Sequence, residues 1–148
     1  MARGDVASEI NARIKKVTED GTAAITKGDL CIVRAGLVKK ITAVTDVGPY
    51  CVTIEDIAKS ATGRVIFEGV VQMSEGNDGA LTFGDIVIPS GTTLGDVKKG
   101  TTADFSATYV QAEVKELRLI VGIVWEGGGI AKDGTGEILL GFRTGLSD

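Results

Sequence analysis

The chain has 148 residues, the length of one domain with at most a short appendage. It contains no histidine, which excludes a Ser–His–Asp triad, a Cys–His dyad and any zinc site that needs an imidazole ligand. Its 16 Lys and Arg residues against 20 Asp and Glu residues leave a net charge of −4, whereas nucleic-acid binders carry clustered positive charge. We therefore expect neither nucleic-acid binding nor histidine chemistry.

Residues 1–21 are predicted to form an N-terminal arm with one helical segment. The apolar residues of this arm recur at spacings of three or four, which is the stripe of an amphipathic helix: Val6, Ile10, Ile14 and Val17. Such a stripe packs either on the domain that follows or on a neighbouring protein, and the sequence favours neither. We name the four residues as a candidate partner-binding surface.

Residues 22–148 are predicted to form an all-β domain, because Val, Ile and Thr far outnumber Leu and glycines punctuate the chain. Short β-branched runs between Gly or Asp turns are typical of a small β-barrel or sandwich. The predicted strands are Asp29–Arg34, Leu37–Val44, Tyr50–Ile54, Arg64–Met73, Asp85–Ile88, Thr108–Val114, Leu117–Val124 and Glu137–Phe142. The fold class is therefore all-β, a small barrel with a short helical arm.

Two short segments resemble each other: Thr26–Leu30 reads TKGDL and Thr82–Ile86 reads TFGDI. Each predicts a Gly–Asp turn that opens an apolar strand. Two copies of a five-residue turn are weak support for a duplication. We expect the same turn to be used twice, without a repeat architecture.

Two features of the sequence indicate the compartment in which the protein is made: it has two cysteines, and it shows no export signal. No stretch approaches the ~18 apolar residues that span a bilayer, and residues 1–10 lack the apolar centre of a signal peptide. We expect a protein made in the cytoplasm, with no membrane partner. Cys31 and Cys51 lie in apolar runs and are expected to be buried thiols, although the sequence leaves a disulfide open.

The glycine-rich segments do not match known catalytic loops. Gly95–Gly100 has the glycine spacing of a phosphate-binding loop, but Thr101 stands where the lysine is required. No G-x-S-x-G segment provides a serine nucleophile. We therefore expect no enzyme, no cofactor and no metal.

Trp125, the only tryptophan, follows an apolar run and precedes three glycines. It either closes one end of the core or stands at the surface as an anchor for a partner, where tryptophan is enriched. We name it as a candidate interface residue.

Six segments occur in a distinctive order: Gly28–Gly36 (GDLCIVRAG), Cys51–Ala58 (CVTIEDIA), Gly63–Met73 (GRVIFEGVVQM), Phe83–Ser90 (FGDIVIPS), Ile120–Gly128 (IVGIVWEGG) and Gly134–Phe142 (GTGEILLGF). This order of a Gly–Asp strand, a Gly-Val-Val strand, a second Gly–Asp strand and a closing apolar strand resembles the capsid cement, or head-decoration, proteins of tailed phages.

The resemblance implies a β-barrel or β-tulip domain on the exterior of the virion. It implies binding near the local three-fold axes as a homotrimer, bridging neighbouring copies of the major capsid protein, with no catalysis. The alternatives are another virion β module, in a fibre or tail, and a small-ligand-binding β-barrel with a pocket of convergent polar groups.

Overall fold

The computed structural model describes residues 1–100 and 119–141, and all regular secondary structure in this part is β-strand. The strands are β1 (Val6–Glu19), β2 (Leu30–Arg34), β3 (Leu37–Lys40), β4 (Tyr50–Thr53), β5 (Thr62–Ser74), β6 (Ile86–Pro89), β7 (Val97–Lys99), β8 (Gly122–Val124) and β9 (Thr135–Leu140). The expected all-β class is confirmed. Among the described residues, no helix long and apolar enough to cross a membrane is present.

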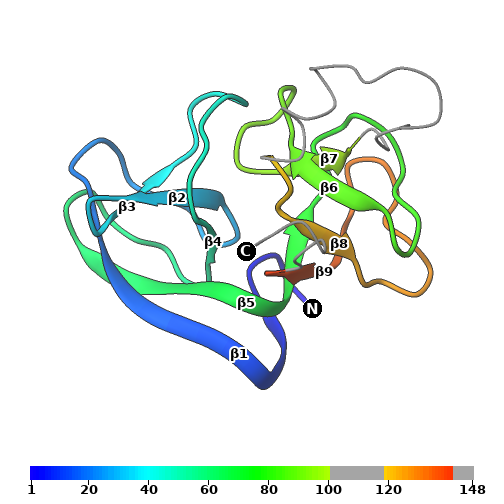
Figure 1. The fold of residues 1–148 in the computed structure, drawn as a ribbon, viewed down its shortest axis with the longest axis horizontal. Coiled ribbons are helices and arrows are strands. Elements are labelled where there is room, and N and C mark those ends of the chain that lie inside the picture. Colours follow the sequence, from blue (N-terminus) through cyan, green and yellow to red (C-terminus); the bar gives the residue numbers. More distant parts are fainter. Residues whose placement is uncertain (101–118, 142–148) are drawn as a thin grey trace, which may run out of the picture.

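The strands form one mixed sheet in the order β1-β3-β2-β4-β5-β9-β8-β6-β7. β1 and β3 run parallel, and the other neighbours in this order are antiparallel. Because β1 also pairs with β5, the strands β1, β3, β2, β4 and β5 form a closed circuit, which we call the first half. Figure 1 shows it on the left, with β5 continuing into the other half.

A second circuit is built on the far end of β5. There β5 pairs with β9, and the order continues through β8 and β6 to β7. β7 returns to the end of β5 through a parallel bridge between Glu75 and Val97. We call this circuit the second half. The beginning of the long strand β5 therefore completes the first half, and its end is the first strand of the second half.

The two halves repeat the same contacts across the sheet. In the first half the hydroxyl oxygens of Thr18 and Thr62 lie 3.0 Å apart, hydrogen-bonded across β1 and β5. In the second half the hydroxyl oxygens of Ser74 and Thr135 lie 2.9 Å apart across β5 and β9. The residue after the first hydroxyl of each pair is a buried glutamate: Glu19 follows Thr18 at the end of β1, and Glu75 follows Ser74 directly after β5.

Corresponding bridges also precede the two Gly–Asp turns. Ile25 pairs with Ile57 in the first half, and Leu81 pairs with Ile130 in the second, both antiparallel. The similarity of the two Gly–Asp segments is therefore part of a duplicated structural unit, and the expectation of a turn merely used twice is wrong. The duplication is faint in the sequence because most matching contacts are backbone hydrogen bonds, which constrain side chains little.

Buried apolar side chains form two clusters. The larger one extends over both halves, with Ile66, Val71 and Met73 of β5 among its members. The smaller one lies in the first half and contains Cys31 and Cys51, which face each other on β2 and β4. Both cysteines are buried and free, as expected, and burial raises the pKa of the Cys51 thiol to about 12.

Two buried glutamates hold the loops at corresponding places in the two halves. The carboxylate of Glu19 accepts backbone N–H bonds from Gly21, Thr22, Ala23 and Ser60 at 2.7–3.2 Å. The carboxylate of Glu75 accepts four more, at 2.6–2.9 Å, from Asn77, Asp78, Gly79 and Asp133. Burial opposes ionisation, but the donors outweigh it and lower the pKa of Glu19 to about 2 and that of Glu75 below its usual value.

We expect the protein to lose stability as the pH falls below about 4.5. A carboxyl group whose pKa is lowered by folding stabilises the folded state fully above its unfolded pKa, and this contribution disappears as the pH falls through the folded pKa. For Glu19 this window runs from 4.5 down to about 2. Thermal unfolding followed by circular dichroism across this range measures the effect, and Glu19→Gln should weaken it. A melting temperature independent of pH in this range would contradict the expectation.

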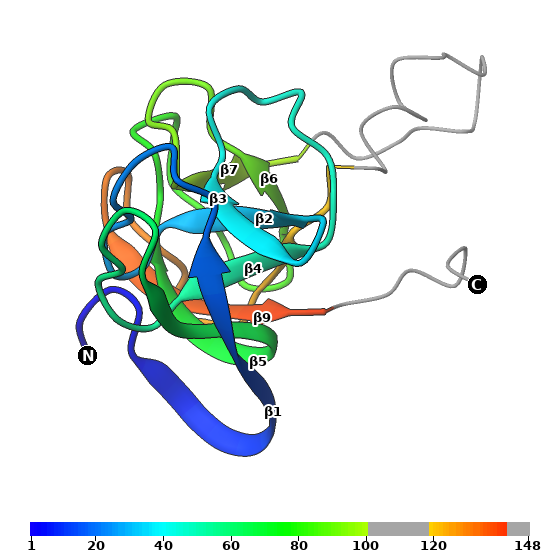
Figure 2. The same ribbon diagram turned by 90° about the vertical axis from the view of Figure 1, so that its left-hand side faces the viewer.

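The predicted N-terminal helix is wrong, because residues 6–19 form β1 and pair with β5. Between Ser8 and Arg13 the register shifts, so that residues 9–12 stand opposite Gly69 alone. This bulge breaks the two-residue alternation that marks a strand and leaves apolar residues at a spacing that resembles a helix. Figure 2 shows β1 making a wide curve at the edge of the molecule before it reaches β3.

Most predicted strands agree with the structure. The six predictions that correspond to β2, β3, β4, β5, β6 and β9 overlap them with shifted ends. The predicted strand Thr108–Val114 lies outside the described residues, as does the beginning of Leu117–Val124, whose end is β8. β7 was not predicted, because its three residues, VKK, carry too little apolar pattern.

Candidate functional site

The two Gly–Asp turns, Thr26–Asp29 and Thr82–Asp85, have the same geometry. In each one the aspartate carboxylate accepts the backbone N–H of the threonine, at 3.0 Å in the first turn and 2.9 Å in the second. The glycine has φ of +88° in the first turn and +87° in the second, a conformation that favours glycine. The two turns differ in what surrounds them.

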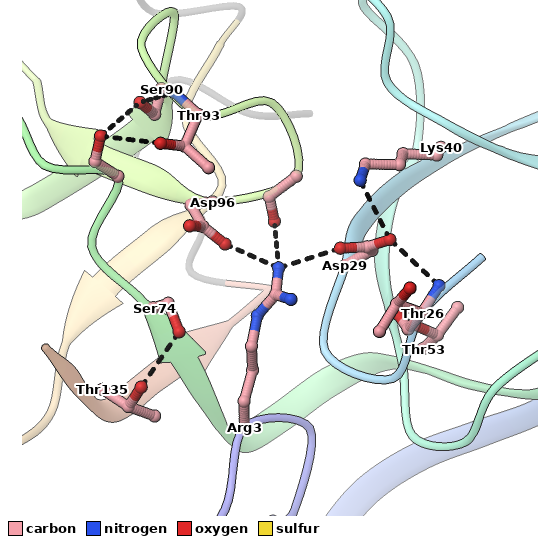
Figure 3. A network of polar contacts seen from close by, with 12 residues as sticks. Arg3, Thr26, Asp29, Lys40, Thr53, Ser74, Ser90, Thr93, Asp96 and Thr135 are labelled. Atoms are coloured by element: carbon pink, nitrogen blue, oxygen red, sulfur yellow. Dashed lines mark hydrogen bonds and ion pairs between the residues drawn. The ribbon is translucent and has the colours of Figure 1, made fainter. Parts of the chain in front are cut away.

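The first turn is covered by the N-terminal segment. The guanidinium of Arg3 contacts Asp29 of the turn at 2.9 Å and Asp96, just before β7, at 2.6 Å, and donates to the carbonyl of Gly95 at 3.3 Å. Lys40 of β3 adds a second cation, 3.2 Å from Asp29. Figure 3 shows the Arg3 side chain between the two aspartates. Arg3 therefore joins the two halves of the molecule.

Backbone packing holds the same segment in place. The N–H of Gly4 donates to the carbonyl of Gln72 on β5 at 2.7 Å. A Cβ at Gly4 would lie 2.6 Å from Cγ of Lys27, so only glycine fits so close to the first turn. The ammonium of Lys27 donates to the carboxylate of Asp5, which lowers the pKa of Asp5. Residues 3–5 are thus tied to the first turn by charge and by close contact.

Asp96 shows the electrostatic cost of this arrangement. Burial raises its pKa, the Arg3 guanidinium opposes that rise, and the nearby Asp29 carboxylate adds to it. Two carboxylates in one partly buried place repel each other unless a cation lies between them. Arg3 supplies that cation, so the N-terminal segment offsets the repulsion between the two carboxylates.

The second turn is open. A Cβ added at Gly84 would meet no atom of the described residues within 4 Å, whereas one at Gly28 would lie 2.2 Å from Arg3 Cγ. Among the residues that the structure describes, the Asp85 carboxylate has one cationic partner, Lys99, at 3.4 Å. No counterpart of the N-terminal segment lies on this turn among the described residues.

An exposed aromatic pair stands at the second turn. Phe83 lies within the turn and is 57% exposed, and Trp125, just after β8, is 44% exposed. Their ring centroids are 5.7 Å apart with the planes tilted by 47°. The N–H of Gly84 donates to the carbonyl of Val124 at 2.9 Å, which holds the backbone of the two segments together. Two large apolar rings on a rigid frame at the surface are suited to binding a partner.

The structure separates the predicted partner-binding residues. Trp125 belongs to the aromatic pair and lies at the surface, while its role as an anchor for a partner stays a prediction. Val6 and Ile14 line a hollow in the first half, and Val17 packs against the smaller core cluster. Ile10 lies on β1, at the bulge. The four apolar residues of the predicted arm therefore do not form the continuous stripe of a helix.

Two residues of the site were not predicted from the sequence. Phe83 directly precedes the Gly–Asp pair of its turn. Turns usually carry small or polar residues, so a large apolar side chain at this place was the signal that could have marked Phe83 as a site residue. Arg3 had no signal, because its partners lie far along the chain and only folding brings them together.

No cluster of three or more carboxylate or thiol side chains able to hold a metal ion occurs in residues 1–100 and 119–141. No family model matches the chain, and no curated protein matches it.

Proposed function

We propose that this chain is a structural virion protein that binds the outside of a tailed-phage capsid and cements neighbouring major-capsid subunits, as a homotrimer near the local three-fold axes. The exposed Phe83–Trp125 pair is the observation that carries the proposal. It is supported by the order of the six segments that resemble capsid cement proteins.

The physical requirements of such a role agree with the molecule. A protein that binds only the assembled shell stabilises it by mass action, and repetition over the shell multiplies a modest contact. Aromatic side chains supply much binding energy from a small area. The net charge of −4 disfavours adhesion to nucleic acid.

We also propose that each closed circuit of strands is a small barrel of the β-tulip kind.

Quantitative mass spectrometry of purified particles tests the proposal. We expect about one copy of this chain for each copy of the major capsid protein, as a protein bound all over the shell requires. A few copies per particle would favour a fibre or tail module instead. Absence from particles would overturn both virion functions and leave a ligand-binding protein as the alternative.

Substitution of the aromatic pair tests the surface involved. Phe83→Ser combined with Trp125→Ser should lower the copy number in particles by about ten-fold or more, since central aromatic residues dominate interfaces. The matched control, Leu37→Ser with Val47→Ser, removes two exposed apolar side chains from the first half. Equal occupancy of the capsid by both double variants would show that the aromatic pair is not the interface.

A further inference from the structure

The open turn and the covered turn occupy equivalent positions in the duplicated fold. The N–H of Gly28 donates to the carbonyl of Thr53 at 2.8 Å, and that of Gly84 donates to the carbonyl of Val124 at 2.9 Å. These bonds place each turn against the end of the corresponding strand, β4 or β8. The residues that flank these hydrogen bonds in the first half therefore occupy the same positions as those that flank them in the second half.

The aromatic pair stands where the first half has Lys27 and Ile54. Phe83 precedes its turn glycine as Lys27 does, and Trp125 follows β8 as Ile54 follows β4. A second pair of bonds agrees: the N–H groups of Ile54 and Trp125 both donate to carbonyls on the last strand of their own half, at 3.2 Å and 2.8 Å. The two surfaces are thus two versions of one structural site.

In the first half this site is filled by a tight turn of the chain itself, residues 2–5, in which the N–H of Asp5 donates to the carbonyl of Ala2 at 3.0 Å and the φ of Gly4 is +80°. Residues 1–6 lie over it, and a cavity of about 310 Å³ remains between them and Ile54, lined also by Ile14 and Arg64. Arg3 reaches the aspartate of the turn, and Asp5 pairs with Lys27. The occupant is therefore a short turn that combines an arginine and a glycine, with an apolar residue on either side, Met1 and Val6.

The turn aspartate and its lysine partner are more exposed in the second half than in the first. The side chain of Asp29 is 2% exposed and that of Asp85 is 16% exposed. The lysines that pair with them differ in the same direction: Lys40 is 38% exposed and Lys99 is 58% exposed. The second half keeps the anionic turn and has two aromatic rings where the first half has a lysine and an isoleucine.

We propose that the Phe83–Trp125 surface binds a short turn of a partner protein, with an arginine directed at Asp85 and a small or apolar residue on the rings. The proposal rests on the proposed function, so the partner is a major-capsid subunit. An arginine suits this place because the guanidinium pairs with the Asp85 carboxylate and also stacks on aromatic faces. The protein's own residues 3–5 are not the occupant in a second copy, because the ion pairs of Arg3 already hold them.

The single tryptophan makes the proposal measurable in solution. We would titrate the full chain with the synthetic peptide MARGDVAS, the chain's own segment for the equivalent site, and follow Trp125 fluorescence. We expect a saturable change. Replacing the peptide arginine by glutamate should weaken binding at least about ten-fold, as loss of a charge-assisted bond does. Phe83→Ser in the protein should have a similar effect, whereas the control Val47→Ser should bind like the wild type.

The results that would contradict the proposal differ from those that would contradict the proposed function. A fluorescence change that is equal for the arginine and glutamate peptides, or absent at millimolar peptide, would overturn the proposal. Sedimentation that shows self-association, lost in Phe83→Ser, would make a second copy the occupant instead. Neither result depends on the copy number in particles, so failure of the inference and failure of the proposed function are told apart.

Discussion

Glu75→Ala is expected to lower the free energy of unfolding by about 4 kcal/mol, roughly 1 kcal/mol for each of four backbone N–H groups that lose a buried acceptor. Three of these groups belong to the loop after β5 and the fourth to Asp133, before β9. The carboxylate therefore ties two loops of the second half to the strand that both halves share. Its removal should loosen the frame beneath the aromatic pair.

Chemical denaturation of the wild type and the variant measures this effect. Glu68→Ala is the matched control, because Glu68 lies on β5, the strand that Glu75 follows, and among the described residues its side chain makes one weak, exposed ion pair, at 3.8 Å. We expect this control to change stability by no more than about 0.5 kcal/mol. A loss below about 1 kcal/mol for Glu75→Ala would mean that solvent replaces the carboxylate, contrary to its burial.

Arg3→Ala is expected to cost about 3 kcal/mol, the range found when one partner of a buried ion pair is removed. The substitution leaves the Asp29 and Asp96 carboxylates facing each other, with Lys40 as the remaining cation at this place. Because burial already raises the pKa of Asp96, the loss of Arg3 should raise it further. The destabilisation should therefore be largest at neutral pH and shrink as the pH falls towards the pKa of Asp96.

A double variant separates charge repulsion from lost packing. Asp96→Asn removes one of the two facing carboxylates, so it should destabilise the wild type but restore part of the stability of Arg3→Ala. Equilibrium unfolding of the four proteins gives the coupling energy between the two positions. Additive effects would show that Arg3 acts only through its contacts with neighbouring backbone and not as the shared counter-ion.

The duplicated turn connects these stability predictions with function. In the first half the turn is used internally, where Arg3 joins both halves. In the second half the same turn remains at the surface with Phe83 and Trp125. One structural unit thus serves once for folding and, in the function we propose, once for binding.

Part of this fold was predictable because the information is local. Runs such as Leu30–Arg34 and Ile86–Pro89 are β-branched and end in Gly or Pro turns, so their strands were expected. The register between strands was not predictable, because it depends on partners far apart in the chain. β1 illustrates the difference: its bulge opposite Gly69 gives a helical spacing to residues that pair with β5.

The amino-acid sequence by itself determined the all-β class, most strand positions, the two Gly–Asp turns and the burial of Cys31 and Cys51. These follow from side-chain shape and polarity over a few neighbouring residues. Only the tertiary structure decided that the halves are duplicates, that β1 is a strand and that Arg3 fills one turn while the other stays open. Those features depend on backbone pairing and on charges brought together from distant positions, which leave little trace in local patterns.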